Sequence, residues 1–323
     1  MGAVAVKPPS PWAFHLHGAT WLVVIVLSVA YWAAVRRSAW PTRRQIVATV
    51  SALVLLSVAL TWPLADLAAH TSLTALVVQR LLLLLAVPPL LMIGLPPPLM
   101  VRLTRPAPID WALRRCARPP IAVAVVTVIA LATLSTVAVE AEGSSAWARL
   151  GLDLVLMAAG FVLWTPVLTE LPGTDRPSAL GRAAYLIVQS IVPSFLAVIW
   201  IFARHPLYPH FAEGDRLWNV SPVMDQQMAG FVAKFATIAV LWTVAFVGLT
   251  RAQRVVETGG DPDPLLWSDV ERHLERAERM ERRRAAWLPP SLVDPPPTEG
   301  RFDTEEDADS GAHDMGRRRL EEP

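Results

Sequence analysis

The sequence predicts an all-α integral membrane protein, a bundle of seven transmembrane helices with its N-terminus outside and its C-terminus inside the cell. Three observations support this fold class. Apolar runs recur, each about as long as the roughly 20 residues that a helix needs to cross a bilayer. Basic residues gather in alternate loops. Charged residues make up 18% of the chain, whereas a soluble domain usually carries about 25%.

The apolar runs carry ordinary helix punctuation. Ser221-Pro222 places a capping hydroxyl before a proline at a first helical position, which favours a helix start there. Pro88-Pro89 and Pro193 remove backbone donors inside two runs, so we expect those helices to bend. The seven predicted spans are Leu16–Val35, Gln45–Leu64, Leu73–Leu95, Ile121–Val139, Arg149–Leu168, Ala183–Phe202 and Met228–Thr250.

The loop charges predict the orientation. The second loop offers only Asp66, and the fourth only Glu140 and Glu142, whereas the first and third loops are rich in arginine. Because basic loops stay in the cytoplasm, the odd-numbered loops are expected on the cytoplasmic side. The membrane is expected to be the inner membrane of a bacterial cell. The arginines are Arg36, Arg37, Arg43 and Arg44 in the first loop, and Arg102, Arg105, Arg114, Arg115 and Arg118 in the third.

The chain divides by composition into a transmembrane domain, 1–250, and a cytoplasmic tail, 251–323. Within the tail, 263–287 could form a charged helix at the membrane surface, and the proline-rich and acidic end has too few apolar residues to fold. The net charge of +1 gives no footprint for nucleic acid. Cys116 is the only cysteine, so an intrachain disulfide is excluded.

Ionisable residues inside the apolar runs require an explanation, because a charge within a membrane is unfavourable. Arg149 and Asp153 lie four residues apart and therefore on one helix face. With Arg80 and Lys234 they form a candidate intramembrane charge cluster near the outer ends of three helices, and Asp225 is a further candidate member. The alternative is that the long basic side chains reach the interface and only hold the helices in register.

The most distinctive motif is the hexapeptide Asp225–Gly230. Asp225 falls in a first helical turn, where the positive end of the helix dipole favours a carboxylate. Gln226 and Gln227 can form hydrogen bonds between helices, and Gly230 allows close approach of two backbones. A structural role alone would explain this motif.

Histidines raise the question of a metal. His15, His17 and His70 are the candidate ligands, and all three are expected on the outer side with His205 and His210. None forms the i, i+4 pair that favours a preformed metal site on a helix. Ordinary interfacial histidines are therefore the simpler interpretation. No cofactor is assigned, and copper stays a secondary hypothesis.

Taken in order, several motifs resemble the CtaG family of cytochrome c oxidase assembly factors, the polytopic kind linked to the caa3-type oxidase. The resemblance covers roughly 12–249 and implies an accessory, non-enzymatic factor whose partners are oxidase subunits or the assembly machinery, in addition to the lipid bilayer. The motifs are Trp40-Pro41, Pro63, Pro88-Pro89-Leu90-Leu91 with Gly94 and Pro96, Gly160-Phe161 with Trp164 and Pro166, Tyr208, Asp225-Gln226-Gln227 and Ala229-Gly230.

The chain departs from the family at its helical histidine pairs. Where the family's third helix resembles HMxQHMLL, Gln79 matches but Leu76 and Arg80 replace the histidines. Arg149 and Asp153 stand where a second pair is expected in the fifth helix. Arginine stays protonated and is a poor metal ligand, so a fixed ionic cluster in place of a metal site is the hypothesis for this chain.

Two other functions stay open. A transporter or channel for a small solute or ion could use a pathway past Arg80, Asp153 and Lys234. Lys234 also suggests a rhodopsin-like sensor, but it lies near its helix start and the third helix offers no carboxylate as counter-ion. The sequence leaves the oligomeric state open.

Overall fold

The computed structural model describes residues 18–38, 40–104, 106–168, 177–212, 219–260 and 278–280. The chain separates into two units, Met1–Leu266 and Trp267–Pro323. In the second unit the described residues 278–280 are helical, and the rest of the predicted surface helix lies outside the described residues, as do His15 and His17. The predicted division of the chain at residue 250 stays a prediction.

All regular structure in the described residues is helical. The helices are α1 (Gly18–Ser38), α2 (Arg43–Leu60), α3 (Leu64–His70), α4 (Leu73–Leu81), the π-helix η1 (Leu82–Ala86), α5 (Val87–Gly94), α6 (Pro97–Thr104), α7 (Ala107–Cys116), α8 (Pro119–Thr133), α9 (Thr136–Ser144), α10 (Ala146–Leu168), α11 (Ala179–Ile191), α12 (Ser194–Phe202), α13 (Pro209–Ala212) and α14 (Pro222–Glu257).

Within the described residues, five helices could cross a membrane by length and composition, and the count rises to six if α7 and α8, bent by 98° at their junction, form one span. A shorter apolar helix covers Thr20–Arg36. The helical membrane fold is therefore confirmed, whereas the number of seven spans and the orientation of the termini stay predictions. The five helices are Arg43–His70, Leu73–Gly94, Ala146–Leu168, Ala179–Phe202 and Pro222–Glu257.

The prediction of a single helix over Ile121–Val139 is wrong. Helix α8 ends at Thr133, and the Ser135 hydroxyl caps α9 by accepting from the Ala138 N–H at 3.3 Å. A serine near the middle of an apolar run competes for backbone hydrogen bonds and so favours a helix start. At the break, the backbone carbonyls of Thr133 and Leu134 accept from Arg80 of α4 and from Tyr208, which precedes α13.

The signals at Ser221 and Pro193 are confirmed, whereas the predicted bend at Pro88-Pro89 stays a prediction. The Ser221 hydroxyl accepts from the Met224 N–H at 3.2 Å and starts α14. Pro193 stands at the break between α11 and α12. Before Pro88-Pro89 the backbone widens into the π-helix η1, because prolines have no N–H to donate to the carbonyls four residues earlier.

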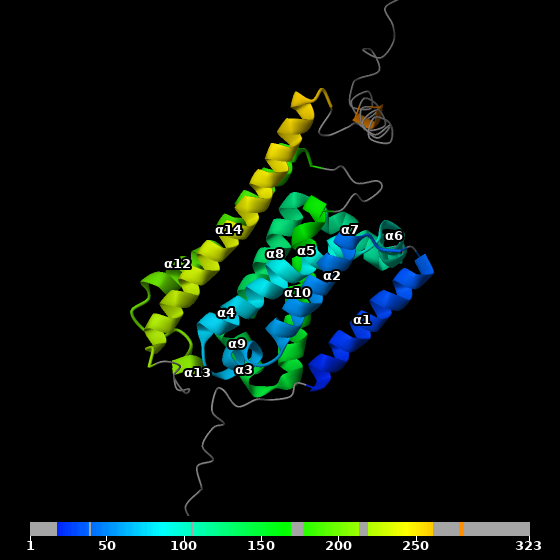
Figure 1. The fold of residues 1–323 in the computed structure, drawn as a ribbon. Helices are drawn as coiled ribbons and strands as arrows, with labels where there is room; N and C mark the ends of the chain where they lie inside the picture. The colour runs from blue at the N-terminus through cyan, green and yellow to red at the C-terminus, as the bar shows by residue number, and fades with distance from the viewer. Residues whose placement is uncertain are drawn as a thin grey trace, which may run out of the picture. The chain divides into compact units, whose positions relative to one another are not determined.

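Helix α14 packs along α11, α12 and α4, while α10 packs along α8 and α5, and α2 along α5 (Figure 1). Helix α1 lies at the edge of this bundle against α2 and α6. One core centres on Trp164, Leu163 and Leu241, and another on Leu76 and Trp200. Many large apolar side chains point outward, which suits a surface that faces lipid.

Gly160 lets α10 approach η1 closely. A Cβ at this position would lie 2.8 Å from the carbonyl oxygen of Leu84 and also against the ring of Pro88. Such a contact with backbone requires the helices to separate. The glycine therefore fixes the distance between α10 and the helix that carries Arg80.

Gly160→Ala is expected to lower the free energy of unfolding in mild detergent by about 1–3 kcal/mol, because overpacking forces backbone shifts. Gly151→Ala is the matched control on the same helix, since a Cβ there meets nothing within 4 Å. The control should be neutral or stabilising by up to about 1 kcal/mol. Equal stability of the two variants would contradict the close approach.

Candidate functional site

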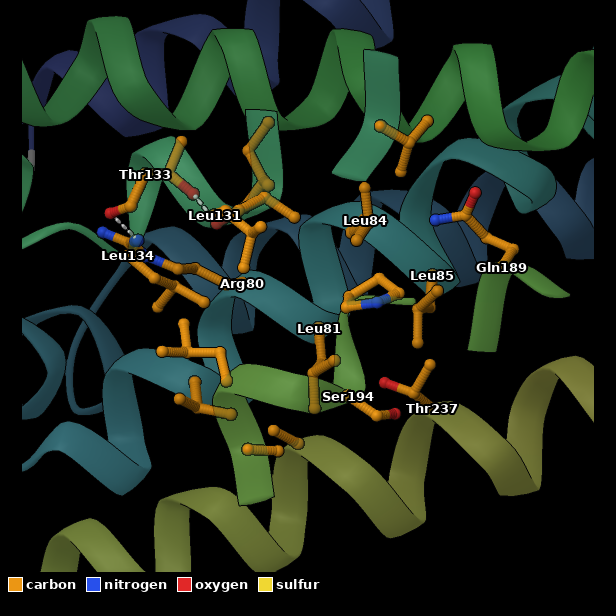
Figure 2. A pocket seen from close by; sticks show the side chains of 18 of the residues that line it. Arg80, Leu81, Leu84, Leu85, Leu131, Thr133, Leu134, Gln189, Ser194 and Thr237 are labelled. Carbon is orange, nitrogen blue, oxygen red and sulfur yellow. Dashed lines mark hydrogen bonds between the residues drawn. The ribbon is translucent and has the colours of Figure 1, made fainter. Parts of the chain in front are cut away.

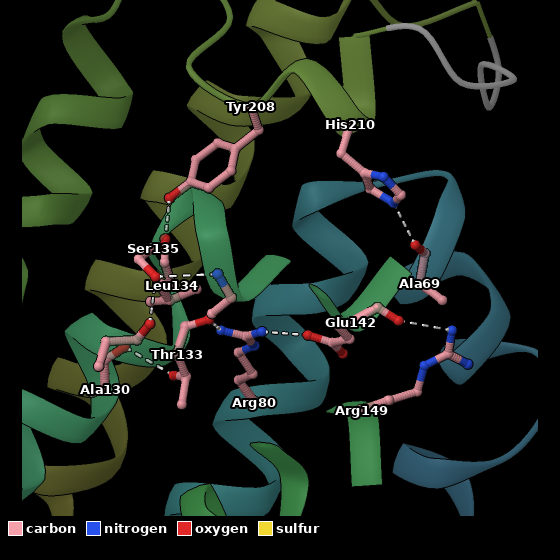
Figure 3. A network of polar contacts seen from close by, with 12 residues as sticks. Ala69, Arg80, Ala130, Thr133, Leu134, Ser135, Glu142, Arg149, Tyr208 and His210 are labelled. Atoms are coloured by element: carbon pink, nitrogen blue, oxygen red, sulfur yellow. Dashed lines mark hydrogen bonds and ion pairs between the residues drawn. The ribbon is translucent and has the colours of Figure 1, made fainter. Parts of the chain in front are cut away.

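A buried ion pair joins Arg80 of α4 to Glu142 of α9. The guanidinium Nη2 lies 2.6 Å from a carboxylate oxygen, and the two side chains are 8% and 4% exposed. The Nη1 group donates to the backbone carbonyl of Thr133 at the end of α8 (Figure 3). One guanidinium therefore connects three helices.

Removing two charges from water costs several kcal/mol per ion, and only close pairing with further hydrogen bonds offsets this cost. The break between α8 and α9 supplies those bonds, since it frees the Thr133 carbonyl and turns Glu142 inward. The pair makes α9 part of the bundle rather than a loop. Sequence analysis missed this role of Glu142 because the fourth apolar run was extended through to Val139.

Further hydrogen bonds lie around this pair (Figure 3). The Tyr208 hydroxyl donates to the Leu134 carbonyl at 2.6 Å, and burial raises the pKa of Tyr208, so the phenol stays a neutral donor. Arg149 Nη2 donates to the Glu142 backbone carbonyl at 3.5 Å. His210 Nε2 lies 2.7 Å from the carbonyl oxygen of Ala69. This network covers the end of the bundle at which α4 and α10 begin.

The structure brings together only part of the predicted charge cluster. Arg80 and Arg149 join the network through Glu142. Asp153 is half-buried and lines a cavity with Gln79 and Arg149. Lys234 is half-buried in α14 and forms no ion pair with another described residue. As a functional unit, the cluster stays a prediction.

Asp225, the further candidate member, belongs to the first turn of α14 and forms no ion pair with Arg80 or Arg149; it contacts the start of α4 instead. Its two carboxylate oxygens accept from the Ser72 hydroxyl at 2.8 Å and the Leu73 N–H at 2.7 Å. The Thr74 hydroxyl donates to its backbone carbonyl at 2.9 Å. The carboxylate thus faces the N-termini of α4 and of its own helix, where the helix dipoles stabilise a negative charge.

The two glutamines of the motif hold the segment that follows α12. Gln226 is 2% exposed; its oxygen accepts from the Leu207 N–H at 2.7 Å, and its nitrogen donates to the His205 carbonyl at 3.4 Å. Gln227 donates to the Ala203 carbonyl at 3.2 Å. Together with Asp225 they join the start of α14 to two other parts of the bundle.

Gly230 brings α14 against α12. A Cβ here would lie 2.7 Å from the carbonyl oxygen of Ala197 and 3.1 Å from the Cβ of Trp200. Gln79, which matches the family's third-helix pattern and is grouped with the Asp225–Gly230 motif as a candidate polar site, is 1% exposed. It lines a cavity with Arg149 and Asp153, separate from the motif.

A small cavity of about 80 Å³ lies among α4, η1, α8, α11, α12 and α14. Arg80 lies at one end, and Gln189, Ser194 and Thr237 lie at the other, with leucines between (Figure 2). The Gln189 side-chain oxygen is buried and has no protein partner among the described residues. At roughly 15 Å³ per water the space suits about five waters and is too small for an organic cofactor.

A helical bundle that buries its polar groups in bonds between helices and turns apolar faces outward is a polytopic membrane protein. The model of the family described as cytochrome c oxidase caa3 assembly factor (Caa3_CtaG) matches residues 26–254. The chain belongs to this family and is an accessory factor in assembly of that oxidase, which confirms the resemblance seen in the sequence. No curated protein and no solved structure matches the chain.

The residues present do not fit copper at the positions of the family's histidine pairs. Leu76 and Arg80 offer no lone pair to a metal, and the Arg80 guanidinium already pairs with Glu142. His70 and His210 approach with ring centroids 6.3 Å apart, yet among the described residues no three His, Cys, Asp or Glu side chains converge.

The ion pair can be tested by a double-mutant cycle. Arg80→Met and Glu142→Leu should each lower the free energy of unfolding by about 3–5 kcal/mol, because each leaves an unpaired buried charge. The double variant should be more stable than either single variant, since an apolar replacement of both partners is often close to neutral. Thermal or denaturant unfolding of the purified protein measures the three differences.

Glu140→Leu is the matched control, because this exposed carboxylate lies two residues before Glu142 in the same helix. It should change stability by less than about 0.5 kcal/mol. Additive losses in the double variant, or single variants no less stable than the control, would show that the pair does not hold the helices together.

Gly230→Ala should destabilise the protein by about 1–3 kcal/mol through the contact with α12. Gly248→Ala lies on the same helix and meets nothing within 4 Å, so it should be neutral or slightly stabilising. Unfolding of both variants in the same detergent gives the comparison. A Gly230→Ala protein as stable as its control would show that α14 and α12 can separate without loss.

Proposed function

We propose that this chain acts without catalysis of its own and assists oxidase assembly by binding an oxidase subunit or the machinery that loads its cofactors. We place it in the inner membrane of a bacterial cell, with seven spans, the N-terminus outside and the C-terminus inside. Membership of the oxidase assembly family supports a role in assembly of the oxidase. The arginine-rich first and third loops support the orientation.

The observation that carries the proposal is the set of hydrogen bonds formed by the Asp225–Gly230 motif. Asp225, Gln226 and Gln227 direct their polar groups to Ser72, Leu73, Ala203 and the 205–207 segment. These hydrogen bonds hold the start of α14, the start of α4 and the segment after α12 in one arrangement. Such a fixed end suits recognition of a partner protein, because a preorganised surface loses little entropy on binding.

The seven-span topology requires α1 and α8 to cross the membrane. Helix α8 has 15 residues, which corresponds to about 22 Å at 1.5 Å per residue, less than the roughly 30 Å of hydrocarbon. Helix α9 follows directly, and its Glu142 is neutralised by Arg80. Pairing in this way allows the polar α9 to complete the crossing that α8 begins.

Redox difference spectroscopy of membranes tests the assembly role. Deletion of the gene should remove the haem a band, and the wild-type gene should restore it. Gly248→Ala should restore it equally, whereas Gly230→Ala should restore it less, because the motif end of α14 is displaced. Metal analysis of the purified protein, made alongside, reports directly on copper.

A tagged copy of the full chain should co-purify an oxidase subunit from the complemented strain. An unchanged haem a spectrum in the deletion strain would contradict the assembly role for this member of the family. In that case the transporter or channel hypothesis would take precedence, and solute-dependent thermal stabilisation would be the next measurement.

A further inference from the structure

A second cavity, of about 290 Å³, lies between α1, α2, η1 and the first half of α10. Its walls are largely leucine side chains from these four elements. Polar side chains interrupt them: Thr20 from α1, Gln79 from α4, and Arg149 and Asp153 from α10. This cavity therefore has an apolar part and a charged part, as a site for an amphiphilic molecule would.

The polar groups of this cavity are short of partners. Gln79 is 1% exposed, and its amide forms no hydrogen bond with any residue that the structure describes. The Nε of Arg149 is buried and has no partner among those residues, although one Nη reaches the Glu142 carbonyl. Asp153 likewise forms no hydrogen bond or ion pair with a described residue. Burying such groups unpaired is unfavourable, so a ligand that pairs them would be stabilised.

The arrangement of the two charges indicates the class of ligand. Arg149 and Asp153 are one helical turn apart on the same face, with their Cβ atoms about 5–6 Å from each other. They are not paired with one another, although each is available to do so. A molecule with an anionic and a cationic group at similar spacing satisfies both at once. A single anion would satisfy Arg149 and be repelled by Asp153.

The position of Arg149 and Asp153 along α10 indicates which kind of zwitterionic molecule could bind. Arg149 and Asp153 are the fourth and eighth residues of α10, near the start of a helix long and apolar enough to cross a membrane. The ends of membrane-crossing helices lie close to the lipid headgroups. The leucine walls extend from them along α1 and α2. A lipid headgroup with an attached acyl chain fits this sequence of charged and apolar surfaces.

We propose that this cavity binds an aminophospholipid of the phosphatidylethanolamine type. The Arg149 guanidinium holds the phosphate, the primary ammonium donates to the Asp153 carboxylate, and the Gln79 amide donates to an ester oxygen. One acyl chain lies against the leucine walls. This site is independent of the assembly role, and either could hold without the other.

The test uses the purified full-length chain, stripped of lipid in detergent, with the affinity for added lipid measured by native mass spectrometry. Phosphatidylethanolamine should bind about tenfold more tightly than phosphatidylcholine, the factor expected for one charge-assisted hydrogen bond. Phosphatidylcholine keeps the positive charge but has no N–H to donate to Asp153. Phosphatidylglycerol, which has no cation, should bind more weakly than phosphatidylethanolamine by a similar factor.

Asp153→Asn should reduce the preference for phosphatidylethanolamine over phosphatidylcholine to less than about threefold, while Glu140→Gln, an exposed acid outside the cavity, should preserve it. Arg149→Ala should weaken all three lipids by about tenfold, and Arg115→Ala, an exposed arginine, should not. A general loss of folding would weaken the lipids together and leave the Asp153→Asn preference unchanged, which the comparison of two lipids detects.

Three results would overturn the proposal. The first is equal binding of the three lipids by the wild-type chain. The second is an Asp153→Asn variant that keeps the full preference. The third is competition by soluble glycerophosphoethanolamine as strong as that of the intact lipid, because the ligand would then be a soluble zwitterion and not a lipid.

Discussion

The buried pairing of Arg80 with Glu142 is the constraint on which the rest of this bundle depends. A guanidinium cannot lose its charge in a protein, so its position in α4 requires an anion and further acceptors close by. The chain meets this requirement by ending α8 early and turning α9 inward. The irregular fourth segment is thus a consequence of one charged residue in a different helix.

The position of α4 is in turn fixed from both ends. At its start, the Asp225 carboxylate accepts from Ser72 and Leu73. At its end, η1 widens the backbone before two prolines, and Gly160 allows α10 to approach. Both contacts hold the helix that carries Arg80 at a defined depth and rotation, which a buried ion pair of 2.6 Å requires.

Helix starts and breaks that depend on one segment alone could be predicted from the sequence. Helix α14 starts at Ser221-Pro222 because the Ser221 hydroxyl caps the backbone of its own helix. The break at Pro193 arises because proline has no backbone N–H to donate. The partner of Arg80 could not be predicted in this way, because it lies 62 residues away. The sequence-based prediction grouped Arg80 with Asp153 and Lys234, because all three are charges inside apolar runs. It placed Glu142 in the fourth loop.

The fourth segment shows why such an error arises. Hydropathy extends smoothly from Ile121 to Val139, so apolar length alone predicts one helix. A single hydroxyl at Ser135 is a weak signal in that context, since serine occurs inside membrane helices as well. The Ser135 cap and the need of Arg80 for carbonyl and carboxylate acceptors together favour the break, and the need of Arg80 cannot be read from the sequence of the fourth segment.

The substitutions at the family's histidine positions acquire a physical meaning from this arrangement. Four groups replace the two pairs, and they do not simply neutralise one another. Arg80 is satisfied by Glu142 and the Thr133 carbonyl, whereas Arg149 and Asp153 face a cavity with Gln79. Arg80 thus forms a closed structural contact, whereas Arg149, Asp153 and Gln79 line the cavity proposed above as a lipid site. Loss of imidazoles at these helices therefore excludes a histidine-bound metal there without making the region inert.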